Sequence, residues 1–336
     1  MGRIGYLVER IIKMNYRGLF QTLIKLHSKT GKSRIWLFYD ISMCGLRYGA
    51  GYKDYELCEF YNLTDAQRAT YVTRAVNNRI VQLLNDPDYY HCVDDKNEFN
   101  RLYAPFIRRG WLDMTTASFE DFQAFMENLD RVISKPIAAC CGQGIEILCK
   151  SNYLDLRQMY EHLVSNQSGL IEEIIVQHPD IAAIYPHSVN TYRIVTVLHE
   201  GQANVVYAFI RLGNGGRFVD NINAGGMAAP IDLDSGKIQY AAFDKDSNYY
   251  DTHPYTGYPI VGCQLPYWKE SLEMCLAAAH VVPQLGYVGW DIAVSQNGPQ
   301  LIEGNEFPGH DILQMPPHVP DKIGMLPRFK QFIPEL

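Results

Sequence analysis

The stretch that decides the fold is residues 289–294, GWDIAV, joined through QNG at 296–298 to LIEGNEFPG at 301–309. Both runs have the apolar character of strands, and an Asn-Gly turn between them predicts a hairpin. Asp291 lies within the first strand, and Glu303 and Asn305 lie on the second. Because side chains two residues apart on a strand share one face, the hairpin can bring Asp291 opposite these two.

These three side chains offer only oxygen ligands. Two carboxylates and an amide oxygen suit Mg²⁺, with water and phosphate oxygens filling its other positions. The alternative is an acidic hairpin with solvated side chains. The apolar flanks of both strands argue against it, because a buried acid needs a partner or a metal. The sequence therefore predicts a metal site at Asp291, Glu303 and Asn305.

A second candidate element is the strand end around Lys135 and Pro136, followed by the small-residue segment 140–146. Backbone N–H groups of a glycine-containing loop can close over phosphates while a lysine supplies fixed charge. An ordinary hairpin loop is the alternative. No Walker-type P-loop occurs, and no helical pattern follows the glycines at 213–216, which excludes a dinucleotide fingerprint there.

Two further strands carry charged residues among apolar ones. The acids within LIEEIIVQ, residues 170–177, could line an adenine pocket or could lie exposed on an edge strand. Arg193 lies in a strand whose neighbours are apolar, so it suits either phosphate binding in a cleft or a structural ion pair. Arg211 adds a second cation near a strand end.

The remaining pattern indicates an α+β protein without internal repeats. Apolar residues at three- and four-residue steps predict a helix over 4–24, and Thr64 with Gln67 forms a capping box opening a helix over 64–86. Further helices are expected near 99–107, 118–128, 153–164 and 266–285, and strands at 131–135, 145–149, 169–175, 192–199, 204–211, 217–221, 287–295 and 299–304.

Charge is unevenly distributed along the 336 residues, whose formal net charge is −7. Residues 1–34 hold eight Lys/Arg and one Glu, a charge of +7, so 22 basic and 36 acidic residues leave −14 for the remainder. This acidic body disfavours nucleic-acid binding. The basic apolar stripe at the N-terminus predicts a helix that either docks on its own domain or lies on an anionic membrane surface.

Cysteine usage and hydropathy point to the cytoplasm. The eight cysteines are scattered without a Cys-x-x-Cys pair, which favours reduced thiols. No apolar run is long enough to span a membrane, and the N-terminus lacks the pattern of a signal peptide. Contact with the inner face of the membrane through residues 1–34 stays open, as does the oligomeric state.

Taken in order, these motifs resemble the ATP-grasp superfamily, most closely its sugar-transfer-associated branch, over about residues 89–315. The stretch that ends LIEGNEFPG is similar to one in D-alanine–D-alanine ligases. The resemblance implies that Asp291, Glu303 and Asn305 bind two Mg²⁺ ions, with Mn²⁺ as an alternative, beside ATP. It also implies that Lys96 and Lys135 are the two nucleotide lysines.

The resemblance extends to other nucleotide contacts. Glu172 and Ile174 would contact adenine, with Glu173 or Gln177 on the ribose, and the loop residues would close over the phosphates. Arg193, Lys135 and Arg211 would act on the transferred phosphate. The cofactor set implied is Lys96, Lys135, Gly142, Gln143, Gly144, Glu172, Glu173, Ile174 and Gln177.

The implied architecture is a helical region 1–88, an N-lobe 89–170 and a C-lobe 171–336, with ATP clamped between two α+β subdomains. The implied activity is carboxylate–amine ligation through an acyl phosphate with release of ADP, in polysaccharide or small-metabolite biosynthesis. A nucleotide-binding partner of glycan enzymes and a kinase-like transfer to an alcohol are alternatives. Such ligases usually carry an α/β domain where this chain is helical, so their substrate pocket cannot be carried over.

Overall fold

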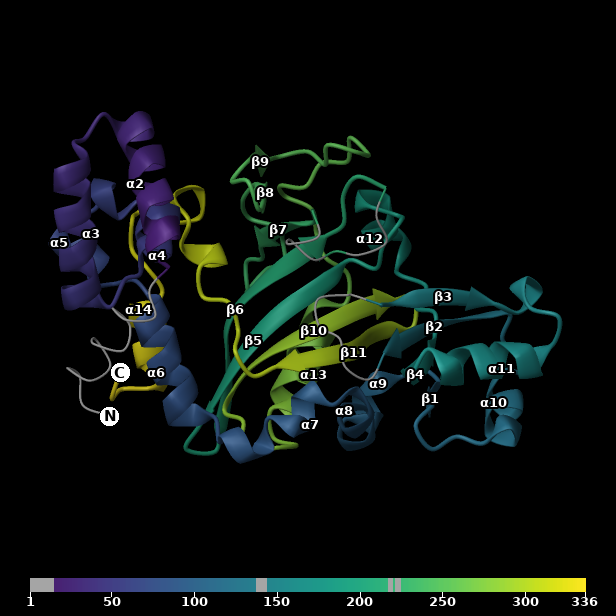
Figure 1. Ribbon diagram of the computed structural model, residues 1–336. Helices are drawn as coiled ribbons and strands as arrows, with labels where there is room; N and C mark the ends of the chain where they lie inside the picture. Colours follow the sequence, from purple (N-terminus) through teal and green to yellow (C-terminus); the bar gives the residue numbers. More distant parts are fainter. Residues whose placement is uncertain (1–14, 137–143, 217–219, 221–224) are drawn as a thin grey trace. The chain divides into compact units, whose positions relative to one another are not determined.

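The computed structural model describes residues 15–136, 144–216, 220 and 225–336 (Figure 1). They form two compact units, one of residues 84–308 and one that joins the described part of 1–83 to 309–336. Helices accompany two sheets whose strand pairings are all antiparallel within these ranges. The predicted α+β class is therefore confirmed.

The larger sheet of the 84–308 unit has the strand order β11-β10-β5-β6-β7-β8-β9 (Figure 1). Its strands are β5 (Thr191–His199), β6 (Gln202–Leu212), β7 (Met227–Pro230), β8 (Ala242–Asp244), β9 (Tyr249–Tyr250), β10 (Tyr287–Ser295) and β11 (Gly298–Asn305). The hairpin predicted at 287–304 is thus present as β10 and β11. The strand predicted at 217–221 lies, apart from residue 220, outside the described residues.

Helix α13 (Trp268–Ala278) packs on this sheet through a shared apolar core. Alternate residues of β10, namely Trp290, Ile292 and Val294, are buried in that core, which leaves Asp291 on the opposite face. The helix is shorter than the predicted 266–285. Short helices α7 (His91–Asp94), α8 (Lys96–Leu102), α9 (Ala104–Ile107) and α12 (Pro179–Ile184) belong to the same unit.

The smaller sheet has the order β1-β4-β2-β3 and a core of its own. Its strands are β1 (Trp111–Asp113), β2 (Arg131–Pro136), β3 (Glu146–Cys149) and β4 (Ser168–Glu173). Helices α10 (Phe119–Phe125) and α11 (Leu156–Ser165) bury Phe122 and Met159 against Val132 and Ile171. The two sheets of the 84–308 unit therefore have separate cores.

Asn85 fastens the start of β10 from outside the sheet. Its amide nitrogen donates to the carbonyls of Tyr287 and Glu306, both at 2.8 Å, and its oxygen accepts the Tyr287 N–H at 2.7 Å. The side chain is 4% exposed, so no water can replace it readily. One buried amide thereby holds both ends of the β10–β11 hairpin region.

We expect Asn85→Ala to lower the free energy of unfolding by about 3 kcal/mol, because three buried backbone groups lose their partner. Urea unfolding checks this, with Asn166→Ala as the control, since Asn166 lies exposed at the end of α11. Equal losses in both variants would contradict the role given to Asn85.

The second unit is helical. It contains α2 (Tyr16–Thr30), α3 (Arg34–Tyr48), α4 (Tyr52–Leu57), α5 (Asp65–Arg68), α6 (Arg74–Leu84) and α14 (Leu326–Phe332), with α6 ending one residue past its boundary. The predicted capping box is confirmed, since Thr64 accepts from the Gln67 N–H at 3.3 Å and Gln67 accepts from the Thr64 N–H at 2.9 Å. No helix in the described part of the chain is long and apolar enough to cross a membrane.

The helix predicted over 64–86 is interrupted between α5 and α6. The side chain of Gln314 accepts from the Val72 N–H at 2.8 Å and donates to the Val72 carbonyl at 2.9 Å. The N–H of Leu326 donates to the carbonyl of Thr70 at 2.8 Å. Backbone groups of Thr70 and Val72 thus bind distant residues and not their neighbours in a helix. The periodicity of the local sequence does not reveal such long-range partners.

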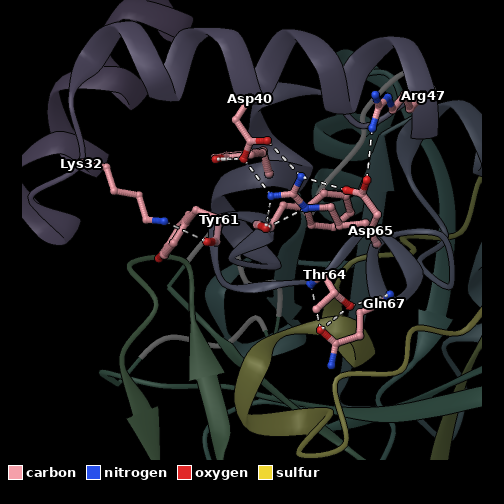
Figure 2. A network of polar contacts seen from close by, with 10 residues as sticks. Lys32, Asp40, Arg47, Tyr61, Thr64, Asp65 and Gln67 are labelled. Carbon is pink, nitrogen blue, oxygen red and sulfur yellow. Dashed lines mark hydrogen bonds and ion pairs between the residues drawn. The ribbon is translucent and has the colours of Figure 1, made fainter.

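A polar network fixes α3 from its inner side (Figure 2). The guanidinium of Arg68 donates to both oxygens of Asp40, at 2.9 and 2.8 Å, and the Tyr55 hydroxyl donates to Asp40 at 2.7 Å. Arg68 also donates to the carbonyl of Phe60 at 2.9 Å. Since Asp40 and Arg68 are both buried, this bidentate pair orients the helix.

The apolar stripe predicted along the first helix is only partly buried. Leu19, Leu23 and Leu26 of α2 are in the core of the unit, whereas Phe20 is 61% and Ile24 52% exposed. The apolar side chains of α2 therefore cover a wider arc of the helix than the face that is buried against the rest of the unit. Residues 4–14 of the predicted helix lie outside the described residues.

Candidate active site

The centre of the site is Asp291, on the face of the larger sheet opposite α13. Asp291 lies directly across from Arg193 of β5, whose Nε donates to one oxygen and whose Nη2 donates to the other at 2.8 Å. Arg211 of β6 donates from Nη1 to the second oxygen. Burial raises the pKa of Asp291, but the two guanidinium groups outweigh it and hold the value well below the usual range.

Glu303 is the direct cross-strand partner of Asp291 in the β10–β11 register. The predicted pairing is therefore present, and a β-bulge between Asp291 and Ile292 sets it, since the register of the turn alone would place Ile302 opposite Asp291. Its carboxylate lies 3.8 Å from Arg193, and the side chain is 53% exposed, so one acid of the pair faces open space. Partial burial and the carboxylate of Asp291 raise the pKa of Glu303 to about 7.

Asn305 lies two residues beyond Glu303 and pairs with Gly289. Its side-chain oxygen accepts the Phe307 N–H at 2.8 Å. A Cβ atom at Gly289 would stand 3.0 Å from Cδ of Arg193, so the glycine leaves room for that arginine. The sequence has no arginine beside Asp291, and Arg193 and Arg211 supply the positive charge from neighbouring strands instead.

The donor set fits Mg²⁺ in kind: two carboxylates and an amide oxygen on one face of a hairpin. Within the described residues, no three His, Cys, Asp or Glu side chains lie close enough together to hold a metal ion. A metal bound by Asp291 and Glu303 would therefore need Asn305 and phosphate oxygens as further ligands. Both oxygens of Asp291 accept from arginines. We expect at least one arginine to turn toward phosphate when an ion binds.

Lys135 and Glu172, both predicted to bind nucleotide, contact each other on neighbouring strands of the smaller sheet. Lys135 Nζ lies 2.5 Å from Glu172, whose side chain is 2% exposed. Glu172 also accepts from Arg109 at 2.6 Å and from Asn100 at 3.1 Å. Burial raises the pKa of Glu172, but Lys135 and Arg109 outweigh it and lower the value to about 2.

Arg109 is a buried partner of Glu172 that the sequence did not predict. Its side chain is 4% exposed, and besides Glu172 it binds the carbonyl of Leu301 on β11 at 2.7 Å. Arg109 therefore links the smaller sheet to the edge of the larger one. Glu172 itself could have indicated such a residue in the sequence, because a buried acid in an apolar strand requires cations nearby.

Lys96 begins α8, with Asp95 as the N-cap accepting from the N–H groups of Asn97 and Glu98 at 2.9 and 3.0 Å. Asn100, which donates to Glu172, lies one turn after Lys96 and on the same helix face. The two predicted nucleotide lysines thus lie on elements that meet at Glu172. Whether Lys96 contacts phosphate stays a prediction.

The phosphate loop is only partly described. Gly142 and Gln143 lie outside the described residues. Gly144 has a φ of 70°, a conformation that glycine adopts readily, and a Cβ there would stand 3.0 Å from Pro136.

The predicted adenine segment continues from the end of β4. Glu173 accepts the Gly110 N–H at 2.8 Å. The Gln177 amide donates to the carbonyls of Tyr185 and Ser188 at 3.0 and 2.7 Å, so it is engaged by the protein itself.

Glu173, Ile174, Ile175 and Val176 line a cavity of about 260 Å³ together with the β10–β11 turn. Nε of Arg109 and Oε1 of Gln300 are buried without a partner among the described residues, and both residues line this cavity.

The chain matches the model of a family described as sugar-transfer associated ATP-grasp over residues 75–332 of its 336. The match runs from α6 through α14 and leaves α2 to α5 outside it. Comparison with curated proteins finds no relative by sequence.

Several solved ATP-grasp structures are similar to the chain. The ATP-grasp ligase PsnB with minimal precursor, Mg and ADP is 16% identical at a TM-score of 0.41, covering 73% of this chain and 61% of that one. D-alanine–D-alanine ligase from Bacillus anthracis is 14% identical at 0.43, covering 77% and 74%. D-cycloserine synthetase DcsG is 14% identical at 0.43, covering 78% and 77%. The chain thus spans 61% of the PsnB chain's length.

Proposed function

We propose that this chain, which belongs to the sugar-transfer associated ATP-grasp family, is an ATP-dependent carboxylate–amine ligase. One observation carries the proposal: Asp291 and Glu303 face each other across the β10–β11 hairpin, with Arg193 and Arg211 on the next strands. Acids and arginines converging on one sheet face suit a metal–phosphate group better than a structural ion pair, because Glu303 is left half exposed.

In this proposal a substrate carboxylate oxygen attacks the γ-phosphorus of ATP, and ADP leaves with the electrons of the broken P–O bond. The resulting acyl phosphate is attacked at its carbonyl carbon by an amine, which loses a proton as inorganic phosphate departs. When bound, two Mg²⁺ ions, or Mn²⁺, neutralise charge on the phosphate oxygens. Asp291, Glu303 and Asn305 would hold them.

The chain's own cations have separate tasks. Arg193 and Arg211 reach the face where Asp291 lies, and they would stabilise charge on the transferred phosphate. Lys135 would act from the smaller sheet, with Lys96 on α8, and the 140–144 loop would exclude water. The cavity bordered by 173–176 supports placing the base beside that segment, with Glu173 or Gln177 toward the ribose.

We place the two lobes of the clamp at 89–170 and 171–308, because residues 309–336 belong to the helical unit, and we place the reaction in the cytoplasm. The family description names sugar transfer, which favours polysaccharide biosynthesis, or that of a related small metabolite. The acid and the amine are small molecules that we leave unnamed.

The purified chain, screened with amino acids and amino sugars, should release ADP and phosphate only when a carboxylate and an amine are both present. Metal removal with a chelator should abolish release, and Mg²⁺ should restore it. AMP as product would refute the ligase. Phosphorylated substrate without ligated product would indicate a kinase-like transfer, and ATP binding without turnover a partner protein.

A further inference from the structure

The outer side of α3 has a surface that soluble helices rarely show. Its inner side buries Leu37, Ile41 and Cys44, and Arg68 holds Asp40 there. The opposite side carries five large apolar residues at high exposure: Ile35 at 85%, Tyr39 at 63%, Phe38 at 50%, Leu46 at 49% and Trp36 at 40%. Between residues 35 and 46 the only charged side chain is Asp40, which is buried.

This pattern is unusual because a surface helix normally places charged residues on its solvent face. Scattered apolar residues are common on proteins, but a whole helix face without a charge marks an interaction surface. Helix α2 adds Phe20 and Ile24, exposed on successive turns. Both helices lie outside the region matched by the family model, so the ligase fold does not account for them.

The charge near this surface decides what it meets. Residues 15–39 contain five basic residues and no acidic one: Arg17, Lys25, Lys29, Lys32 and Arg34. Lys25 and Lys29 pair with Glu56 and Glu59, whose side chains are 10% and 25% exposed, so five cations and two acids leave a net charge of +3. An anionic partner is therefore favoured.

The chemistry of the face favours a lipid surface over an acidic protein. Trp36 and Tyr39 have apolar bodies and polar tips, as do aromatic residues at membrane–water interfaces. Lys32 Nζ lies 4.2 Å from the centre of the Trp36 ring, so a cation stands at the edge of the apolar face. Apolar and aromatic side chains bordered by cations are what interfacial helices present to anionic bilayers.

We propose that the outer face of α3, residues 35–46, with Phe20 and Ile24 of α2, docks the protein onto the interface of an anionic lipid bilayer. The apolar side chains enter the boundary between headgroups and acyl chains, and the neighbouring lysines and arginines meet the headgroups. This inference does not depend on the proposed ligase activity.

Sedimentation of the full chain with vesicles tests the proposal. We expect binding to vesicles of phosphatidylglycerol and phosphatidylcholine, little binding to phosphatidylcholine alone, and weakening in high salt. Ile35→Glu or Tyr39→Glu should each lower binding at least about tenfold with an unchanged melting temperature, because both side chains are exposed. Leu154→Glu, at a residue 92% exposed on the other unit, is the matched control and should bind normally.

Three outcomes would overturn it. The first is the absence of binding to anionic vesicles, and the second is binding that Ile35→Glu and Tyr39→Glu leave intact while deletion of residues 1–14 abolishes it. The third is concentration-dependent dimerisation in light scattering that Ile35→Glu removes, since the face would then join two copies of this chain.

Discussion

Replacing Glu303 by glutamine will lower the rate of ADP release by about a hundredfold or more. The substitution keeps the shape of the side chain but removes one of two carboxylates that would hold Mg²⁺. The fold should not suffer, because Glu303 is 53% exposed and its closest acidic neighbour is Asp291, whose like charge is unfavourable. The free energy of unfolding should therefore stay equal or rise slightly.

Steady-state ADP release with saturating Mg²⁺ and ATP measures the effect, and urea unfolding measures stability. Glu273→Gln is the matched control, because Glu273 is exposed on α13, which packs on the other face of the same sheet. That variant should turn over ATP at the rate of the unchanged protein. Full activity in Glu303→Gln would remove Glu303 from the metal site and the proposed mechanism with it.

Glu172→Gln will destabilise the protein by about 3 to 5 kcal/mol at neutral pH. The carboxylate is 2% exposed and pairs with Lys135 and Arg109, at 2.5 and 2.6 Å. An amide cannot neutralise them, so two cations would stay buried without a counter-charge. ATP affinity should fall as well, since Lys135 loses the partner that positions it.

The loss should depend on pH. The pKa of Glu172 is lowered to about 2 in the folded protein against an ordinary value of 4.5. Its stabilisation is therefore complete above pH ~4.5 and disappears as pH falls toward 2, because the unfolded chain takes up the proton first. Urea unfolding of both proteins at several acidic pH values should show their difference shrinking.

Glu146→Gln is the control for this series, because Glu146 lies on β3 of the same sheet with its side chain 54% exposed. It should change stability by less than about 0.5 kcal/mol. If Glu172→Gln matched it, the buried ion pairs would contribute nothing measurable.

Local pattern predicted the parts of the fold whose causes are local. The β10–β11 hairpin follows from strand alternation and an Asn-Gly turn, and both are readable in a short stretch. The pairing of Asp291 with Glu303 also needs a β-bulge between Asp291 and Ile292, because the register counted from the turn would place Ile302 opposite Asp291. The capping box at Thr64 is equally local. The α+β class and the family followed from the order of such segments.

Contacts between distant segments were not readable in the same way. Asp291 meets Arg193 and Arg211 from 98 and 80 residues away, and Glu172 meets Arg109 from 63 residues away. The spacing of residues along the chain does not predict which cation will pair with a buried acid. For that reason the sequence could not decide whether Arg193 binds phosphate or forms a structural ion pair. The structure shows an ion pair with Asp291, and phosphate binding remains a prediction.

The sequence by itself determined the hairpin and the family, because these depend on side-chain period, turn chemistry and the order of motifs. The β-bulge between Asp291 and Ile292, which puts Glu303 on the same face as Asp291, was decided by the tertiary structure. Only the tertiary structure decided that residues 309–336 join the N-terminal helices in one unit and that Gln314 interrupts the helix at Val72. The tertiary structure also decided that Phe20 and Ile24 are exposed while the leucines of the same helix are buried, because burial depends on what packs against a helix.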